Sequence, residues 1–361
     1  MILDTCGAGA EAIRHLTKGL ALLQTLPDAA ERAEQEIQMQ ILLGEIFMAV
    51  KGFGAQETED AYLRARELCM KLVESPHLSF VLLGLWAVYL DRAELPKARA
   101  LAEQLLHLAE RQEKPFIWGY VAMTATFFFQ GEFARVLSHA DHAVALYSER
   151  DSPQSETLDP KEAAFAYYSP VSEWSLGYPD RAVQKSDEAC TLAAELAHPF
   201  RLSLANVGAA WVHLARHDGQ AAQRRAEVTI ALSSKYGFPY WLAMGTIFRG
   251  AALAQQGRFE EGLEQMRWGL DAVRPTGTYV VTTYYLVLLI EAYRKCGQWQ
   301  EGMGRVAEAL AFMERTGERL YEAELYRLKG ELTLQALDQN GEQKTEEAEA
   351  FFHQAFDIAQ Q

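Results

Sequence analysis

The residues of this 361-residue sequence that could bind a metal ion are two histidines in one short string. His139 and His142 stand three positions apart, a spacing that would place two metal ligands on one face of a helix. No third ligand type is close to them in the sequence, and Ala140 and Ala143 occupy the face that should pack. We therefore interpret both histidines as solvated helix residues, and the sequence predicts neither a metal ion nor a cofactor.

Residues 302–307 match the G-x-G-x-x-[GA] pattern with which dinucleotide-binding folds hold a pyrophosphate. That site needs a strand before the pattern, whereas the surrounding apolar residues here recur at helical spacing, so we interpret Gly302 as a packing residue. The sequence contains no G-x-x-x-x-G-K-[ST], H-E-x-x-H or G-x-S-x-G. A helical hydrolase would need paired inward carboxylates, and only Glu173 and Glu291 are near the expected face. We therefore predict that the chain is not an enzyme.

Charge and cysteine content narrow the function further. With 34 Lys and Arg against 49 Asp and Glu, the net charge is −15, which disfavours nucleic-acid binding. The four cysteines are far apart, as suits a reducing compartment, and Cys69 and Cys190 fall at one repeat position that predicts packing. There is no signal peptide, and the longest apolar stretches are shorter than the ~20 residues of a membrane span. We expect a soluble, cytoplasmic protein without nucleic-acid or membrane partners.

The elements that must carry these residues form internal repeats. A small residue followed seven positions later by another small or apolar residue recurs on an apolar helical stripe, about every 40 residues. The first members of these pairs are Ala12, Ala61, Ala98, Val136, Ala182, Ala221, Gly262, Gly302 and Ala348. Prolines recur at a similar interval, and a turn, often Gly-x-aromatic, lies between the two helices of each unit. The pattern predicts an all-α, right-handed solenoid of helical hairpins, each with a helix A and a helix B.

The predicted domain organisation is one solenoid over residues 1–361. An orphan helix B at 8–26 precedes eight hairpins, and a polar insertion at 148–159 interrupts them. Neither end carries the polar cap that a solenoid needs, so we expect the chain to be a segment of a longer protein or to bind partners at its ends.

The Gly-x-aromatic-x-x-Ala turn with small residues seven apart resembles the tetratricopeptide repeat (TPR), although the unit is longer than its usual ~34 residues. Several stretches resemble the C-terminal TPR region of bacterial signalling proteins in which an adenylate/guanylate cyclase and an AAA-like ATPase come first. These stretches are residues 13–32, 51–53, 61–69, 176–182, 236–250 and 316–332. The resemblance implies a sensing or interaction arm, and the catalytic residues of that family lie upstream of this segment.

Inward-facing positions of helix A provide the candidate binding site, as they do in TPR-like solenoids. Counting back from each turn, the expected concave-groove residues are Trp118, Phe128, Tyr167, Trp174, Asn206, His213, Tyr284, Glu291 and Arg294. Aromatic and polar side chains together suit a peptide groove, whereas the alternative is that these aromatics pack between neighbouring A helices. We predict a non-catalytic scaffold for bacterial signal transduction that binds a protein segment, possibly the upstream ATPase or cyclase. The alternative is a sensor that binds a metabolite in the groove.

Overall fold

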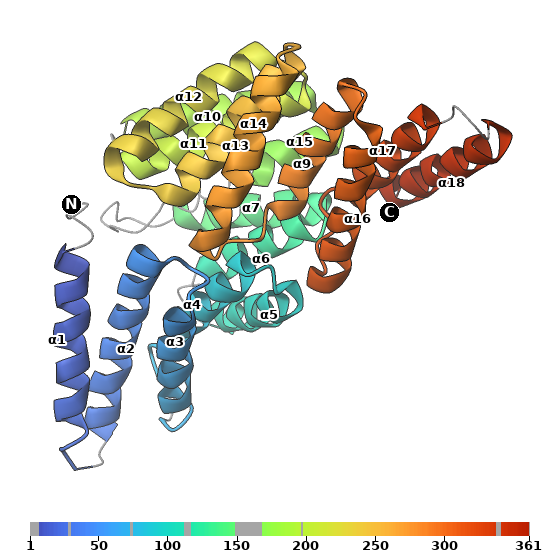
Figure 1. Ribbon diagram of the computed structural model, residues 1–361. Coiled ribbons are helices and arrows are strands. Elements are labelled where there is room, and N and C mark those ends of the chain that lie inside the picture. The colour runs from blue at the N-terminus through green and yellow to red at the C-terminus, as the bar shows by residue number, and fades with distance from the viewer. Residues whose placement is uncertain are drawn as a thin grey trace. The chain divides into compact units, whose positions relative to one another are not determined.

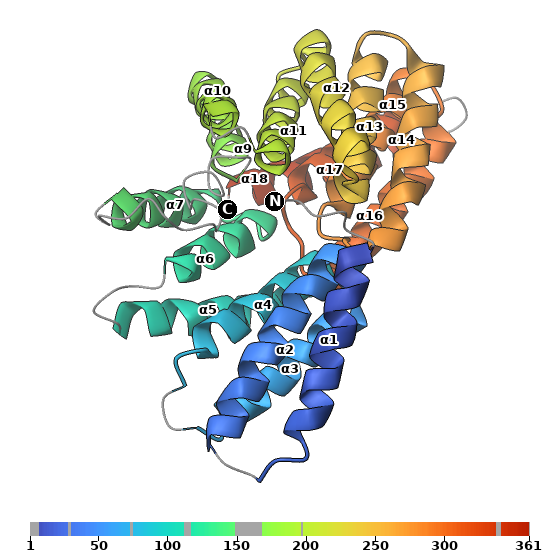
Figure 2. The ribbon, with the colours of Figure 1, turned by 90° about the vertical axis from the view of Figure 1, so that its left-hand side faces the viewer.

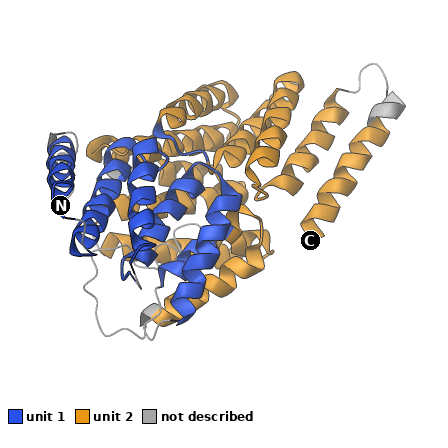
Figure 3. Ribbon diagram, turned by 90° about the horizontal axis from the view of Figure 1, so that it is seen from below, with its two compact units in different colours: residues 1–126, 276–279 blue, residues 127–275, 280–361 orange. Residues whose placement is uncertain are grey.

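The computed structural model describes residues 7–27, 30–72, 75–111, 117–148, 168–195, 198–336 and 341–360. Within these ranges the regular structure is helical and contains no strand, which confirms the all-α prediction. The chain divides into two compact units, which Figure 3 colours separately. Unit 1 comprises Met1–Thr126 and Thr276–Tyr279, and unit 2 comprises Phe127–Pro275 and Val280–Gln361.

Unit 1 is a series of antiparallel helices in which each packs on the next (Figures 1 and 2). Its helices are α1 (Gly7–Leu23), α2 (Ala30–Lys51), α3 (Gln56–Cys69), α4 (Leu78–Asp91), α5 (Leu95–Arg111) and the first part of α6 (Trp118–Phe129). The four residues Thr276–Tyr279 join this unit through backbone contacts, since the Tyr279 amide donates to the Asp91 carbonyl oxygen at 2.6 Å.

Unit 2 continues the same alternation of helices. It contains α7 (Phe133–Ser148), α9 (Ser169–Ser175), α10 (Pro179–Glu195), α11 (Pro199–Ala215), α12 (Gly219–Tyr236), α13 (Pro239–Gln255), α14 (Phe259–Val273), α15 (Thr282–Lys295), α16 (Trp299–Thr316), α17 (Glu322–Gln335) and α18 (Gly341–Gln360). Each A helix from α11 to α15 packs on its own B helix and also on the next A helix. This double packing is the contact pattern of a helical-repeat solenoid.

The small residues of the repeat pattern lie where helices approach each other closely. All nine fall in B helices, and eight of them are buried, Ala12 being half-buried. A Cβ on Gly262 would stand 2.5 Å from the Gly250 carbonyl oxygen of α13, so α13 and α14 touch backbone to backbone. The prediction that small residues set the distance between the two helices of a hairpin is confirmed at this pair.

The turn between helix A and helix B requires a left-handed backbone. Gly131, Gly177, Gly257 and Gly297 have φ between 75° and 86° there, a region that glycine enters without a Cβ clash. Ala93 and His217 stand at the same turn position and have φ of 59° and 57°. The turn geometry is therefore kept even where the sequence does not provide glycine.

The predicted polar insertion at 148–159 lies outside the described residues, apart from Ser148, which ends α7. The single continuous solenoid stays a prediction. In the part of the chain that the structure describes, no helix is long and apolar enough to cross a membrane.

Candidate functional site

The predicted groove residues lie on A helices and differ in exposure. Trp118 and Phe128 are on α6, Trp174 on α9, Asn206 and His213 on α11, and Tyr284, Glu291 and Arg294 on α15; Tyr167 is outside the described residues. Phe128, Asn206 and Tyr284 are buried, whereas the other described members of the set are half-buried. The set thus separates into an interior part and a partly exposed part.

Phe128 and Tyr284 belong to an aromatic cluster formed by side chains of several A helices in unit 2. The rings of Trp211 and Tyr284 stack with centroids 4.3 Å apart, and Tyr284 stacks on Tyr321 at 4.6 Å. Phe128 and Phe248 meet the Trp211 ring edge to face, at 5.7 and 5.9 Å. Offset-stacked and edge-to-face pairs are the favourable arrangements of aromatic rings. For Phe128 and Tyr284, the alternative prediction of packing between A helices therefore describes the structure.

Two hydrogen bonds join distant parts of the chain around this cluster. The Trp211 indole Nε1 donates to the Tyr321 hydroxyl oxygen at 2.7 Å, and the Arg319 amide donates to the Phe129 carbonyl oxygen at 2.8 Å. Residues 317–321, between α16 and α17, thus contact the end of α6 within unit 2. Because Trp211 is fully buried, its indole N–H needs this partner.

Sequence reasoning missed Trp211 and Tyr321. Both are aromatic residues in or beside A helices, which is a usable signal. However, Trp211 falls between the positions reached by counting back from the turn, and Tyr321 precedes α17 rather than lying on it. Their pairing joins residues 110 positions apart, which no repeat pattern encodes.

Asn206 and His213 on α11 are held by neighbouring polar groups. The Asn206 Nδ2 donates to the Leu202 carbonyl oxygen at 2.8 Å, and Arg225 of α12 donates to the Asn206 Oδ1 at 3.5 Å. Burial lowers the pKa of His213, although the carboxylate of Asp218, 3.8 Å from Nδ1, acts in the opposite direction. His213 is therefore neutral at neutral pH, and its buried Nδ1 has no hydrogen-bond partner among the described residues.

Glu291 and Arg294 form part of a charged row, which we call the A-helix ladder: Glu291, Arg294, Arg327 and Glu331. Arg294 pairs with Glu291 at 2.8 Å within α15 and with Glu331 of α17 at 2.9 Å, and Arg327 pairs with Glu331 at 2.6 Å. Burial opposes ionisation of Glu291, but its contacts with Arg294 and Lys295 hold its pKa below the usual value. The ladder is ionised, electrically balanced and partly exposed on two adjacent A helices.

Unit 2 also contains a fully buried carboxyl group, Glu318. Glu318 has no exposed area, and the Thr283 hydroxyl of α15 donates to its Oε2 at 2.6 Å. Its Oε1 has no hydrogen-bond partner among the described residues. Burial raises the pKa of Glu318 to about 8, so the carboxyl is mostly protonated at neutral pH.

The other residues that were considered for chemistry are structural. Cys190 is buried, packs with Ala189 and Ala205, and burial raises its pKa to about 11, which confirms its packing role. Cys69 is also buried. The His139 ring packs against Phe127 with centroids 5.0 Å apart, and among the residues described no group of three potential metal ligands occurs. Gly302 and Gly304 lie inside the continuous helix α16, without the strand that a dinucleotide site needs.

Comparison with known proteins gives a fold but no family. Neither a protein-family model nor a curated protein sequence matches the chain. Among solved structures, a Rap protein complexed with Competence and Sporulation Factor aligns with a TM-score of 0.60 at 11% identity, over 91% of this chain and 98% of that one. The Rap conjugation gene regulator of plasmid pLS20, in complex with the Phr* peptide, aligns with a TM-score of 0.52 at 12% identity, over 89% and 85%.

A third neighbour bears on the predicted resemblance to signalling ATPases. A signal transduction ATPase with numerous domains and a tetratricopeptide repeat sensor, from Pyrococcus horikoshii, aligns with a TM-score of 0.48 at 13% identity, over 88% of this chain and 48% of that one. A likeness of this strength carries no argument for a shared activity. The comparisons confirm the α-solenoid fold of TPR-like hairpins, and the resemblance to the cyclase–ATPase family stays a prediction.

Proposed function

We propose that the chain is a non-catalytic interaction protein that binds a polypeptide segment along the A-helix side of unit 2. The observation that carries the proposal is the fold shared with two Rap proteins, one solved with Competence and Sporulation Factor and one with the Phr* peptide. At 11% and 12% identity their binding residues cannot be transferred, so the site must come from this chain.

The A-helix ladder supplies the chemistry that an extended peptide requires. Backbone amides and carbonyls need hydrogen-bond partners at intervals, and Arg294 and Arg327 present guanidinium donors while Glu291 and Glu331 present acceptors. The aromatic cluster beneath holds the A helices in fixed positions, which lowers the cost of ordering the site on binding. The net charge of −15 favours a neutral or basic segment, because opposite charge speeds association.

The alternative of a metabolite sensor fits this side of the unit less well. Small-molecule sites use apolar and aromatic walls around a cavity. The rings of Phe128 and Tyr284 instead pack against aromatic neighbours, so they do not line a cavity. The partly exposed members of the set in unit 2 combine one aromatic ring, Trp174, with the polar and charged groups of His213, Glu291 and Arg294, a mixture found in protein interfaces.

Selection from a phage-displayed library of linear peptides against the full chain would test the proposal. Calorimetry on the strongest selected peptide should show binding that weakens at least about tenfold in Arg294→Glu, the loss of one charge-assisted contact. Arg305→Glu is the matched control, since Arg305 lies on the B helix α16 with its own partner Glu308. Unchanged affinity in Arg294→Glu, Trp174→Ala and His213→Ala together would refute this surface.

The partner that we favour is an ATPase or cyclase module of a bacterial, cytoplasmic signalling protein, either in the same polypeptide or separate. This step rests on the sequence resemblance alone. It can be tested by reading the coding DNA upstream of Met1 and blotting the native product. A product of 40.5 kDa without an ATPase region would exclude the attached module and leave a separate partner to be sought by co-purification.

A further inference from the structure

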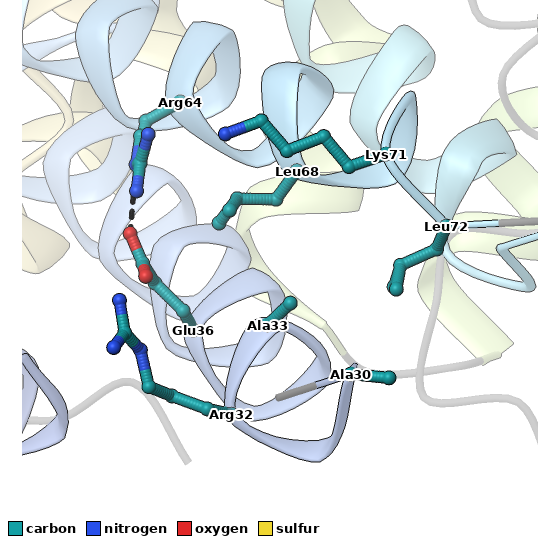
Figure 4. Close-up of a pocket in the computed structure, with 8 residues that line it drawn as sticks. All are labelled: Ala30, Arg32, Ala33, Glu36, Arg64, Leu68, Lys71 and Leu72. Carbon is teal, nitrogen blue, oxygen red and sulfur yellow. Dashed lines mark hydrogen bonds and ion pairs between the residues drawn. The ribbon is translucent and has the colours of Figure 1, made fainter. Parts of the chain in front are cut away.

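A second candidate site lies in unit 1, between α2 and α3, where no predicted site residue falls. A cleft of about 330 Å³ opens there beside Arg32, Glu36, Arg64 and Lys71, and the side chains of Leu68 and Leu72 contribute its apolar lining (Figure 4). The volume is at the lower end of the range for small-ligand sites. The cleft therefore has room for one small molecule or one residue of a peptide.

The polar side of the cleft is built around a buried carboxylate. Glu36 is 4% exposed, and the Arg64 Nε donates to its Oε1 at 2.7 Å. One guanidinium is sufficient to pair this carboxylate, and Arg64 also reaches the exposed Glu67 at 3.2 Å. Arg64 thus compensates the buried charge of Glu36.

Two further cationic residues, Arg32 and Lys71, line the same cleft. Figure 4 shows Arg32 approaching Glu36 from the side opposite Arg64, while the Lys71 side chain extends across the cleft toward them. Arg32 is oriented by a hydrogen bond of 2.7 Å from its Nη1 to the Leu26 carbonyl oxygen. No ion pair of Lys71 occurs among the described residues, and the lining carries three cations and one carboxylate. An anion in the cleft could therefore receive charge-assisted hydrogen bonds from cationic groups that line it.

We infer that this cleft binds a small monocarboxylate with an apolar body, such as a branched short-chain acid or the carboxyl terminus of a polypeptide. The carboxylate would lie between Lys71 and the guanidinium groups, whose planar fork matches its two oxygens. The carbon chain would lie against Leu68 and Leu72. This inference does not rest on the proposed function, because all of its residues lie in unit 1 and the A-helix ladder lies in unit 2.

The experiment uses the full chain and two pairs of probes. The first pair is 3-methylbutanoate and its amide 3-methylbutanamide, and the second is acetyl-Ala-Leu with a free carboxyl terminus and the same dipeptide amidated. Saturation-transfer NMR should give saturable binding of at least one acid. Its amide should bind at least about tenfold more weakly, because the amide is uncharged. Comparison of the two acids distinguishes a free acid from a peptide terminus.

Two exposed lysines in unit 1 give a matched pair of variants. Lys71→Gln should weaken binding of the acid about fivefold or more, and Lys18→Gln, on α1 and away from the cleft, should leave it unchanged. Arg32→Gln should act like Lys71→Gln, and the unfolding midpoint of each variant shows whether it is folded. Equal binding of acid and amide, equal effects of the two lysine variants, or no saturable binding of either acid would overturn the inference.

Discussion

Two buried glutamates, Glu36 in unit 1 and Glu318 in unit 2, have opposite electrostatic surroundings. In unit 1, Glu36 faces the guanidinium of Arg64 at the edge of an open cleft and receives a charge-assisted hydrogen bond. In unit 2, the fully buried Glu318 carboxyl accepts a hydrogen bond from the Thr283 hydroxyl and has no other side-chain donor among the described residues, and its raised pKa keeps it mostly neutral. The same residue type is thus ion-paired in one place and a neutral core group in the other. The difference teaches that a cationic partner, and not burial alone, decides whether a buried carboxyl group keeps its charge, since the fully buried Glu173 of unit 2 also pairs with Arg181 and Lys185.

The largest expected effect tests whether the aromatic cluster is the core of unit 2. Trp211→Ala should lower the free energy of unfolding by about 3–5 kcal/mol, because it removes a fully buried ring that stacks on Tyr284 and leaves Tyr321 without its donor. Urea titration followed by circular dichroism measures it. Trp268→Ala on α14 is the control, since Trp268 is 51% exposed. Similar losses in both variants would mean that the cluster is not a special core.

The second effect concerns the neutral glutamate. The folded pKa of Glu318, about 8, is above its ordinary value of 4.5, so the folded state binds more protons between these pH values and stability falls as pH rises. Glu318→Gln should therefore raise the free energy of unfolding at pH 8 by roughly 2–4 kcal/mol and change it little at pH 4. Asp91, whose pKa burial raises from 3.8 to about 7, should leave a slope of the same sign in the variant between these two pH values. A variant destabilised at pH 8 would show that Glu318 is ionised and paired.

The ion-paired glutamate, Glu36, should respond with the opposite sign. Glu36→Gln should lower the free energy of unfolding at pH 7 by about 1–2 kcal/mol, because a neutral amide replaces the charged acceptor of Arg64. Glu67→Gln is the matched control, since the Glu67 side chain is 65% exposed and pairs with the same guanidinium. The expected change for the control is within about 0.5 kcal/mol. Equal changes in the two variants would remove the contrast between Glu36 and Glu318.

The smallest effect compares the two turns without glycine, Ala93 in unit 1 and His217 in unit 2. His217→Gly should stabilise by about 0.5–1 kcal/mol, because it relieves a left-handed backbone at an exposed position. Ala93→Gly relieves the same strain but loses a methyl group that is 1% exposed, so its net change should be close to zero. Gly257→Ala, with open space around its added Cβ, should destabilise by about 1 kcal/mol and calibrates the cost. Thermal unfolding resolves these differences.

Prediction from sequence was most successful where one repeat contains all the information. Small residues such as Ala98 and Gly262, and turn glycines such as Gly257, specify a helix A, a turn and a helix B without reference to the rest of the chain. The candidate site was predicted only in part. Counting from the turns placed Glu291 and Arg294 on an A helix, but it could not show that Phe128 and Tyr284 would meet Trp211.

The sequence by itself determined the all-α hairpins, their repeat of about 40 residues and the positions at which helices touch, since these depend on local periodicity and turn chemistry. Only the tertiary structure decided that residues 317–321 return to the end of α6, that Trp211 pairs with Tyr321, and that Arg32, Arg64 and Lys71 share one cleft. The physical reason is that small rotations between neighbouring repeats accumulate along the chain. Contacts between distant repeats depend on that sum, which no single repeat encodes.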